Sequence, residues 1–129
     1  MIVVDSSALV AVLAGAPDSG QLVARFSGEE LHAPVLIDYE VLSTARQMAL
    51  DGRLDDERAS DLLLDLDDAP IVRWQPSNAL RRRAFELRQT IGAHDASYVA
   101  LAEALECPLV TRDAHLAGSH GHEAAIELH

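Results

Sequence analysis

The chain of 129 residues contains no lysine, because all ten of its basic residues are arginines. This absence excludes a mechanism that needs a lysine base, a Schiff base or a phosphate-binding lysine. The single cysteine, Cys107, has no partner for an internal disulfide, which indicates a reducing compartment. Because Cys107 stands next to Pro108 and before an apolar segment, we interpret it as a buried structural thiol and not as a nucleophile.

Long hydrophobic runs are also missing. The apolar run from Ala8 to Ala14 has only seven residues, far below the roughly 20 that a bilayer span needs. No basic residue precedes this run, since the first arginine is Arg25, and Asp5 lies just before it. A signal peptide would need a basic segment there. We therefore expect a soluble, cytoplasmic protein that does not bind membranes.

Two further classes of site are absent. The six histidines do not show the spacing of a zinc site, since His120 and His122 lie in a loop-like tail and His129 ends the sequence. His94 stands beside Asp95, and we interpret it as a surface residue. No glycine-rich loop that would hold a phosphate is present.

The charge is strongly acidic but unevenly distributed. A net charge of −11 and a pI of about 4.7 argue against general binding to nucleic acid. Four of the ten arginines are nevertheless close together, at positions 81, 82, 83 and 88. The hydrophobic fraction of 49% argues against disorder, and the length suits one domain with a substantial core.

Short apolar segments alternate with segments that carry helix caps and breakers. The sequence predicts strands at 1–4, 31–33, 71–74, 109–111 and 125–127, and helices at 6–14, 17–26, 34–50, 55–66, 78–91, 95–106 and 113–117. We expect Ser6 or Ser7 to cap the first helix and Asp95 to cap the sixth. This alternation predicts an α/β fold with a mostly parallel sheet, covered by helices on both faces.

Three acidic residues occupy unusual positions in this pattern. Asp5 and Asp113 each follow a short apolar strand, and Asp95 opens an apolar helical segment. The positions just past the strand ends line the crevice in which α/β proteins bind ligands. Because Ser6 or Ser7 can cap the first helix, Asp5 is free for another role. For Asp113, capping of the next helix and a role in the site are equally supported.

The apolar helix that Asp95 opens is predicted to be buried. Its dipole favours the ionised form of Asp95, so capping and metal binding are compatible there. Glu40 lies in the middle of a helix and would be a solvated residue if it had no partners. Asp38 points to nearly the opposite face of that helix, and we assign it to solvent. Thr111 is placed to orient one of the acids.

Carboxylates that converge in one crevice repel one another, so a cation should compensate them. Hard divalent ions that prefer oxygen ligands, Mg²⁺ or Mn²⁺, suit such a site best. The residues alone therefore indicate a metal-dependent enzyme that acts on phosphate esters.

Four stretches of the sequence resemble the PIN-domain ribonucleases, and specifically the VapC-type toxins of bacterial toxin–antitoxin pairs. They occur in the family's order and spacing and extend over nearly the whole chain. These stretches are Ile2 to Leu9, Ala33 to Leu42, His94 to Ala102 and Leu109 to Leu116.

The resemblance implies a single PIN-like domain over residues 1–129, a three-layer sandwich whose parallel sheet has four or five strands. It implies that Mg²⁺ or Mn²⁺ binds to Asp5, Glu40, Asp95 and Asp113 and that the enzyme cuts single-stranded or structured RNA. It further implies a homodimer that is silenced by a small antitoxin, whose tail covers the acidic pocket.

Other residues of the site are expected around this quartet. We expect Ser6 and Thr111 to orient the acids, and Arg112 and Arg83 to contact RNA, because arginine pairs bidentately with phosphate. The arginine cluster that contains Arg83 suits a groove wall, a solvated helix face or a dimer contact equally. Some relatives carry a further acid where this chain has His115, which leaves one or two metal ions as alternatives.

Three other functions fit parts of the pattern. A receiver-like phosphoacceptor domain would need a lysine opposite its acids, and this chain has none. A dehalogenase-like phosphatase would need a second aspartate two residues after the first, where this chain has Ser7. A third alternative is a catalytically weak or inactive PIN-like module that only pairs with an antitoxin.

Overall fold

Five parallel strands form the central sheet in the computed structural model, which describes residues 1–129. The strands lie in the order β3-β2-β1-β4-β5. Their bounds are β1 Ile2–Val4, β2 Leu31–Pro34, β3 Ile71–Trp74, β4 Leu109–Thr111 and β5 Ile126–Leu128. The central strand β1 is wholly buried, as expected for apolar β-branched residues in a sheet that is covered on both faces. The predicted α/β class and the predicted parallel sheet of four or five strands are confirmed, and the sheet has five strands.

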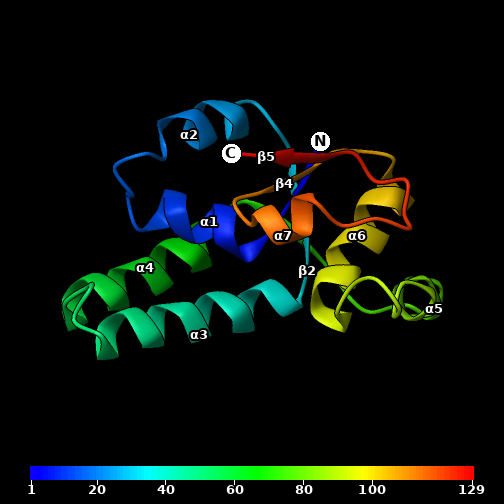
Figure 1. The fold of residues 1–129 in the computed structure, drawn as a ribbon. Helices are drawn as coiled ribbons and strands as arrows, with labels where there is room; N and C mark the ends of the chain where they lie inside the picture. The colour runs from blue at the N-terminus through cyan, green and yellow to red at the C-terminus, as the bar shows by residue number, and fades with distance from the viewer.

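Seven helices surround this sheet. They are α1 Ser6–Leu13, α2 Gly20–Phe26, α3 Leu36–Leu50, α4 Asp56–Asp68, α5 Asn78–Glu86, α6 Ala93–Leu105 and α7 Ala114–Ala117. Helix α6 packs against β1, β2 and β4, whereas α1 packs against β4 and α3 against β2. Figure 1 shows α5 and α6 on one side of β2 and α1, α3 and α4 on the other, which gives three layers.

The parallel register brings the ends of neighbouring strands level. Val3 of β1 lies opposite His32 on one side and Leu109 on the other. The backbone N–H of Asp5 then donates to the carbonyl of Val110, at 3.2 Å. The residues that leave β1 and β4 therefore meet at one edge of the sheet.

Helix α6 is buried along most of its length, as its apolar sequence predicts. Its residues Ala96 and Tyr98–Ala102 are all buried, and several of them are alanines. Small side chains let this helix lie close to the three strands that it crosses. The start of α6 is thereby held firmly at the same edge of the sheet as the ends of β1 and β4.

Some predicted boundaries were wrong. Asp5 caps α1, in place of Ser6 or Ser7, and Gly92 caps α6, in place of Asp95. Helix α2 begins at residue 20 instead of 17, and α5 ends at residue 86 instead of 91. Beyond Glu86 the backbone N–H groups of Leu87, Arg88 and Thr90 donate to the carbonyl three residues earlier, and the chain continues as turns. None of the helices is both long and apolar enough to cross a membrane.

The leucines of α4 provide a matched test of the core. Leu62 is 2% exposed and belongs to the main hydrophobic cluster, whereas Leu64 on the same helix is 60% exposed. We expect Leu62→Ala to lower the free energy of unfolding by about 2–5 kcal/mol, because it leaves a cavity. Leu64→Ala should change it by about 0.5 kcal/mol or less. Urea unfolding measures both values, and equal losses would contradict this assignment of the core.

Candidate active site

Four acidic residues lie on four different elements at the carboxyl edge of the sheet. Asp5 follows β1 and caps α1, and Asp113 follows β4 and caps α7. Glu40 lies in the second turn of α3, and Asp95 lies in the first turn of α6. Figure 1 shows α1 and α7 near the middle of the molecule, between α3 below and α6 to the right. The fold thus brings distant stretches of chain together near one crevice, as expected for an α/β protein.

Asp5 is the most firmly held of the four. Its Oδ1 accepts hydrogen bonds from the Ser7 hydroxyl at 2.7 Å and from the backbone N–H of Ala8 at 3.0 Å. Its Oδ2 accepts one from the Thr111 hydroxyl at 2.7 Å. The carboxylate is buried, so these three donors replace the water that it would otherwise bind.

The same two hydroxyls also bind the turn that follows β4. Ser7 Oγ accepts the backbone N–H of Arg112 at 2.9 Å, and Thr111 Oγ1 accepts that of Asp113 at 2.9 Å. A hydroxyl that accepts from a peptide N–H has its own hydrogen left to donate, and here both donate to Asp5. The positions of Asp5 and Asp113 are therefore coupled through Ser7 and Thr111.

Asp113 caps the short helix α7. Its Oδ1 accepts from the backbone N–H groups of His115 at 2.8 Å and Leu116 at 3.4 Å. Its other oxygen has no protein partner among the hydrogen bonds. Capping and a role in the site, which the sequence left as alternatives, are compatible in this geometry.

Glu40 is held from the opposite layer by Tyr98, whose hydroxyl donates to Oε1. Tyr98 is buried, and burial together with the neighbouring Glu40 carboxylate raises its pKa. The phenol consequently stays protonated and remains a donor at neutral pH. Ser6 makes no hydrogen bond to any of the acids, whose side-chain donors are Ser7, Thr111 and Tyr98.

Asp95 accepts no hydrogen bond from a protein group, although it is half-buried. It occupies the first turn of α6, where the helix dipole favours negative charge. Burial is the largest effect on this carboxyl and raises its pKa, and the nearby charge of Asp113 raises it further. Both of its oxygens are available to a ligand.

The acids influence one another electrostatically. Burial raises the pKa of Asp5, Glu40 and Asp95. The charge of Asp113 adds to the increase at Asp5 and Asp95, and the charges of Asp5 and Asp95 add to the increase at Glu40. Clusters of acids with raised pKa values are frequent in functional sites, because a bound cation can offset the repulsion among the carboxylates.

The acids do not form a ready set of metal ligands. No group of three or more histidine, cysteine, aspartate or glutamate side chains is positioned to hold a metal ion. Three of the four acids are instead turned toward hydrogen-bond donors of their own, which are the groups around Asp5, the start of α7 for Asp113 and Tyr98 for Glu40. The structure brings the four acids to one edge of the sheet, and their joint binding of Mg²⁺ or Mn²⁺ stays a prediction.

The predicted RNA-contacting arginines lie in different places. Arg112 adjoins the site and pairs with Asp18 of the loop before α2. Arg83 pairs with Glu103 at 2.7 and 3.0 Å. Glu103 lies eight residues along α6 from Asp95, which corresponds to about 12 Å of helix. The structure therefore does not bring Arg83 to the acids.

Two other predictions for individual residues need correction. Asp38 does not simply face solvent, because it accepts from Arg73 at 2.8 Å and so ties the start of α3 to β3. Ser6 was expected to orient an acid, but Ser7 has that position. Tyr98 was overlooked as a partner of Glu40. A buried tyrosine usually needs a partner for its hydroxyl, and this was the available signal in the sequence.

Comparison with known proteins identifies the architecture. The family model described as PIN domain matches residues 2–118. Ribonuclease VapC12 of Mycobacterium tuberculosis is 40% identical over 128 residues, which cover 99% of this chain and 98% of that protein. Ribonuclease VapC9 of the same organism is 42% identical over 116 residues, which cover 90% of this chain and 88% of that protein.

Solved structures agree with this result. PAE2754 from Pyrobaculum aerophilum has a TM-score of 0.70 at 29% identity, over 97% of this chain and 81% of that one. Mycobacterium tuberculosis VapC20, described as a sarcin-ricin loop cleaving toxin, has a TM-score of 0.67 at 16% identity, over 93% and 97% of the two chains. The latter likeness concerns the fold alone. Because the family model matches residues 2–118, this chain belongs to the PIN-domain family.

Proposed function

We propose that this chain is a metal-dependent endoribonuclease and the toxin of a toxin–antitoxin pair. One observation carries the proposal: four carboxylates from four separate elements lie at one edge of the sheet, three of them with raised pKa values. The relatives named as VapC ribonucleases support RNA as the substrate. Residues 1–129 form one catalytic domain in this proposal.

The donor chemistry of the site suits Mg²⁺ or Mn²⁺. Its candidate ligands are all carboxylate oxygens, which these hard ions prefer. Both oxygens of Asp95 and one each of Glu40 and Asp113 have no protein partner. A bound divalent ion would activate a water molecule and offset charge on the phosphoryl oxygens.

Each residue of the site then has a distinct part. Ser7 and Thr111 hold Asp5 in one orientation, so that this acid needs no reorganisation during the reaction. Tyr98 fixes one oxygen of Glu40 and leaves the other free. Asp95 is free of hydrogen bonds and is the acid best able to turn toward a ligand. Arg112 stands beside Asp113 and is our candidate for the first contact with an RNA phosphate.

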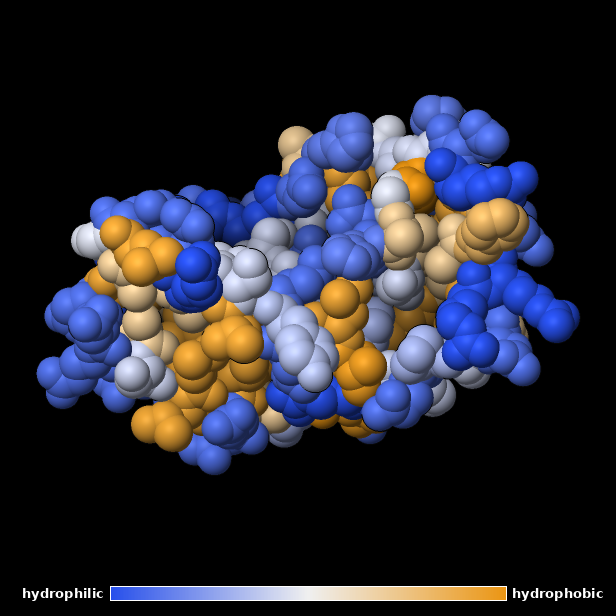
Figure 2. All heavy atoms as spheres, turned by 90° about the horizontal axis from the view of Figure 1, so that it is seen from below, coloured by the Kyte–Doolittle hydropathy of each residue, from blue (hydrophilic) through white to orange (hydrophobic).

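An antitoxin and a second copy of the chain are the proposed protein partners. Solved structures with the same fold include a toxin–antitoxin complex from Klebsiella pneumoniae, with a TM-score of 0.68 at 18% identity, over 92% of each chain. Leu42, Leu50 and Leu64 are exposed on α3 and α4, and Figure 2 shows hydrophobic atoms gathered over these helices. This surface suits the apolar side of an antitoxin. An enzyme that cuts cellular RNA works where that RNA is, so we place it in the cytoplasm.

Asp95→Asn tests the acidic site. We expect it to lower the rate of RNA cleavage by at least about 100-fold, because it removes a charge aimed at the reacting centre. The control Asp67→Asn, on the exposed end of α4, should cleave normally. Normal cleavage by purified Asp95→Asn would refute the site. A wild type that pairs with its antitoxin but cuts no RNA would support the non-catalytic alternative instead.

The same substitution should stabilise the fold at neutral pH. A carboxyl whose pKa is raised in the folded state loses stability as pH rises from its unfolded pKa through its folded pKa. Asparagine does not ionise, so the variant does not lose stability in this pH range. The Tm of Asp95→Asn should therefore exceed that of the wild type at neutral pH, and the difference should vanish below about pH 4. A lower Tm of the variant at neutral pH would contradict the raised pKa of Asp95, which burial causes in the first place and the charge of Asp113 in the second.

Divalent ions should bind and stabilise the wild type. Ligand at about 100 times its Kd adds about 2.7 kcal/mol to the free energy of unfolding. Mg²⁺ or Mn²⁺ should therefore raise the Tm of the wild type and raise that of Asp95→Asn much less. NaCl at equal ionic strength is the control. Cleavage that persists in EDTA, together with no shift in Tm, would remove the metal from the proposal.

Thr111→Val tests the coupling between Asp5 and Asp113. Valine keeps the shape but neither donates to Asp5 nor accepts from Asp113 N–H, so we expect a stability loss of about 1–3 kcal/mol. Cleavage should fall as well. Thr111→Ser keeps the hydroxyl and loses only a methyl group, so it should retain most activity. Equal activity in the two variants would show that the hydroxyl is not needed.

A further inference from the structure

His32 is a buried histidine of the sheet that the proposed site does not use. It lies on β2, is 3% exposed and makes two hydrogen bonds through its side chain. Its Nδ1 lies 2.9 Å from the indole nitrogen of Trp74, and its Nε2 lies 2.6 Å from Oε1 of Glu30. Both nitrogens of the imidazole therefore have a partner.

The chemistry of the two partners decides which nitrogen of His32 carries the hydrogen. The indole nitrogen of Trp74 can only donate, so Nδ1 has to accept and carries no hydrogen. The carboxylate of Glu30 can only accept, so Nε2 has to donate. The structure thus holds His32 in one tautomer of its neutral form.

Protonation of His32 is incompatible with this arrangement. A protonated imidazole carries a hydrogen on both nitrogens, so its Nδ1–H would point at the indole N–H of Trp74. Two donors cannot form a hydrogen bond with each other, and one of the two rings has to move. Histidine is the side chain whose charge changes between about pH 5 and 8, so this conflict arises near physiological pH.

Trp74 is the ring that has room to move. It is 38% exposed and ends β3, which is an edge strand of the sheet. His32 is enclosed, and as a cation it would be paired with the Glu30 carboxylate, which offsets the cost of a buried charge. The backbone carbonyl of Trp74 accepts from the N–H of Val35 at 3.0 Å, so the movement is confined to the side chain.

The Trp74 side chain forms part of the wall of a groove, which we call the aromatic groove. The groove has a volume of about 660 Å³ and lies between the start of α3, helix α5 and the start of α6. Tyr39 and Phe85, which are also exposed, line it as well. None of the four acids of the proposed site lines it. Release of the Trp74 ring would therefore change the shape of a groove that is separate from the acidic site.

We propose that His32 is a pH-dependent switch for Trp74. In its neutral form His32 holds the indole in the wall of the aromatic groove, and on protonation it releases the ring. This inference does not depend on the proposed ribonuclease function, because neither residue belongs to the acidic site. A partner that rests on Trp74 would bind the aromatic groove with an affinity that depends on pH.

Glu30 is the one charged residue that pairs with the imidazole. The elements that pack against β2 are β1, β3, α3 and α6, and β1 has no charged residue. The titratable and charged side chains of the other three elements are Arg73 of β3, Asp38, Tyr39, Glu40 and Arg46 of α3, and His94, Asp95, Tyr98 and Glu103 of α6. None of these side chains forms a hydrogen bond or an ion pair with His32, and Asp38, Glu40 and Glu103 each bind another residue. Glu30 is therefore the charge expected to set the pH of the transition.

The single tryptophan of the chain makes the switch measurable. Between about pH 8 and pH 5, quenching of Trp74 fluorescence by acrylamide should increase by about twofold, because the residue is 38% exposed before release. Far-UV circular dichroism at each pH establishes that the protein is still folded. Quenching that stays constant over this range in folded protein would refute the switch.

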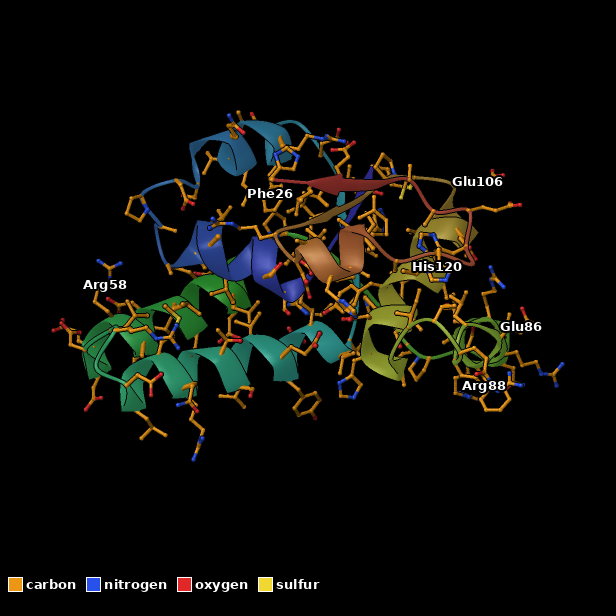
Figure 3. All side chains as sticks on the ribbon, in the orientation of Figure 1. Phe26, Arg58, Glu86, Arg88, Glu106 and His120 are labelled. Carbon is orange, nitrogen blue, oxygen red and sulfur yellow. The ribbon has the colours of Figure 1, made fainter.

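Three variants test whether His32 causes the transition. His32→Asn keeps an oxygen that accepts from the indole N–H but takes up no proton, so the transition should be lost. Glu30→Gln still accepts from Nε2–H but lacks the charge that pairs with the imidazolium, so the midpoint should move to lower pH by roughly 0.5–1. His120→Asn is the matched control and should keep the wild-type transition, because His120 is exposed on the loop between α7 and β5 (Figure 3).

Nitrogen NMR of the wild type gives a readout that needs no substitution, so it decides the tautomer even where His32→Asn does not fold. At about pH 8, the ring nitrogens of His32 should show a hydrogen on Nε2 and none on Nδ1. Three outcomes would overturn the proposal. They are a hydrogen on Nδ1 at this pH, a transition that persists in folded His32→Asn, and an unchanged midpoint in Glu30→Gln.

Discussion

The arrangement of the site depends on the hydrogen bonds that Asp5 accepts from Ser7 and Thr111. Each of these hydroxyls also accepts a backbone N–H from the turn after β4, so each one joins the exits of two neighbouring strands. A buried carboxylate without such donors would be costly. With these donors, the positions of Asp5 after β1 and Asp113 after β4 are fixed relative to each other. The helices that carry Glu40 and Asp95 are packed around this pair.

This organisation has a cost in stability that the rest of the fold must offset. Three carboxyls have raised pKa values, which means that their ionised forms are disfavoured in the folded protein. The offset comes from the apolar surroundings, since β1 is wholly buried and α6 is buried along most of its length. Each acid is thus mounted on an element whose position is set by hydrophobic packing. Bringing like charges together is typical of a site that is built for a cation and not for stability.

The fold and the places of three of the acids, Asp5, Asp95 and Asp113, could be predicted from simple patterns, whereas their hydrogen-bond partners could not. Apolar strands followed by Asp5 and Asp113 mark the edge of the sheet by themselves, but Glu40 in mid-helix gained significance only through the family resemblance. Capping was misassigned at Asp5 because three candidate residues are adjacent, and only the geometry shows which side chain accepts the free N–H. Ser7 and Tyr98 contact residues that are 104 and 58 positions away, and no local pattern encodes such contacts.

The distribution of arginine resolves the apparent conflict between an acidic chain and an anionic substrate. Arg25, Arg73, Arg83 and Arg112 are paired with acids and serve to join elements to one another. Their positive charge is already neutralised, so the average charge of the surface says little about where a polyanion can approach. The region around α5 differs, because Arg81 and Arg88 form no ion pair with an acid and line a groove together with exposed aromatic rings. At physiological salt the Debye length is about 8 Å, so these nearby cations act on a phosphate more strongly than distant acids do.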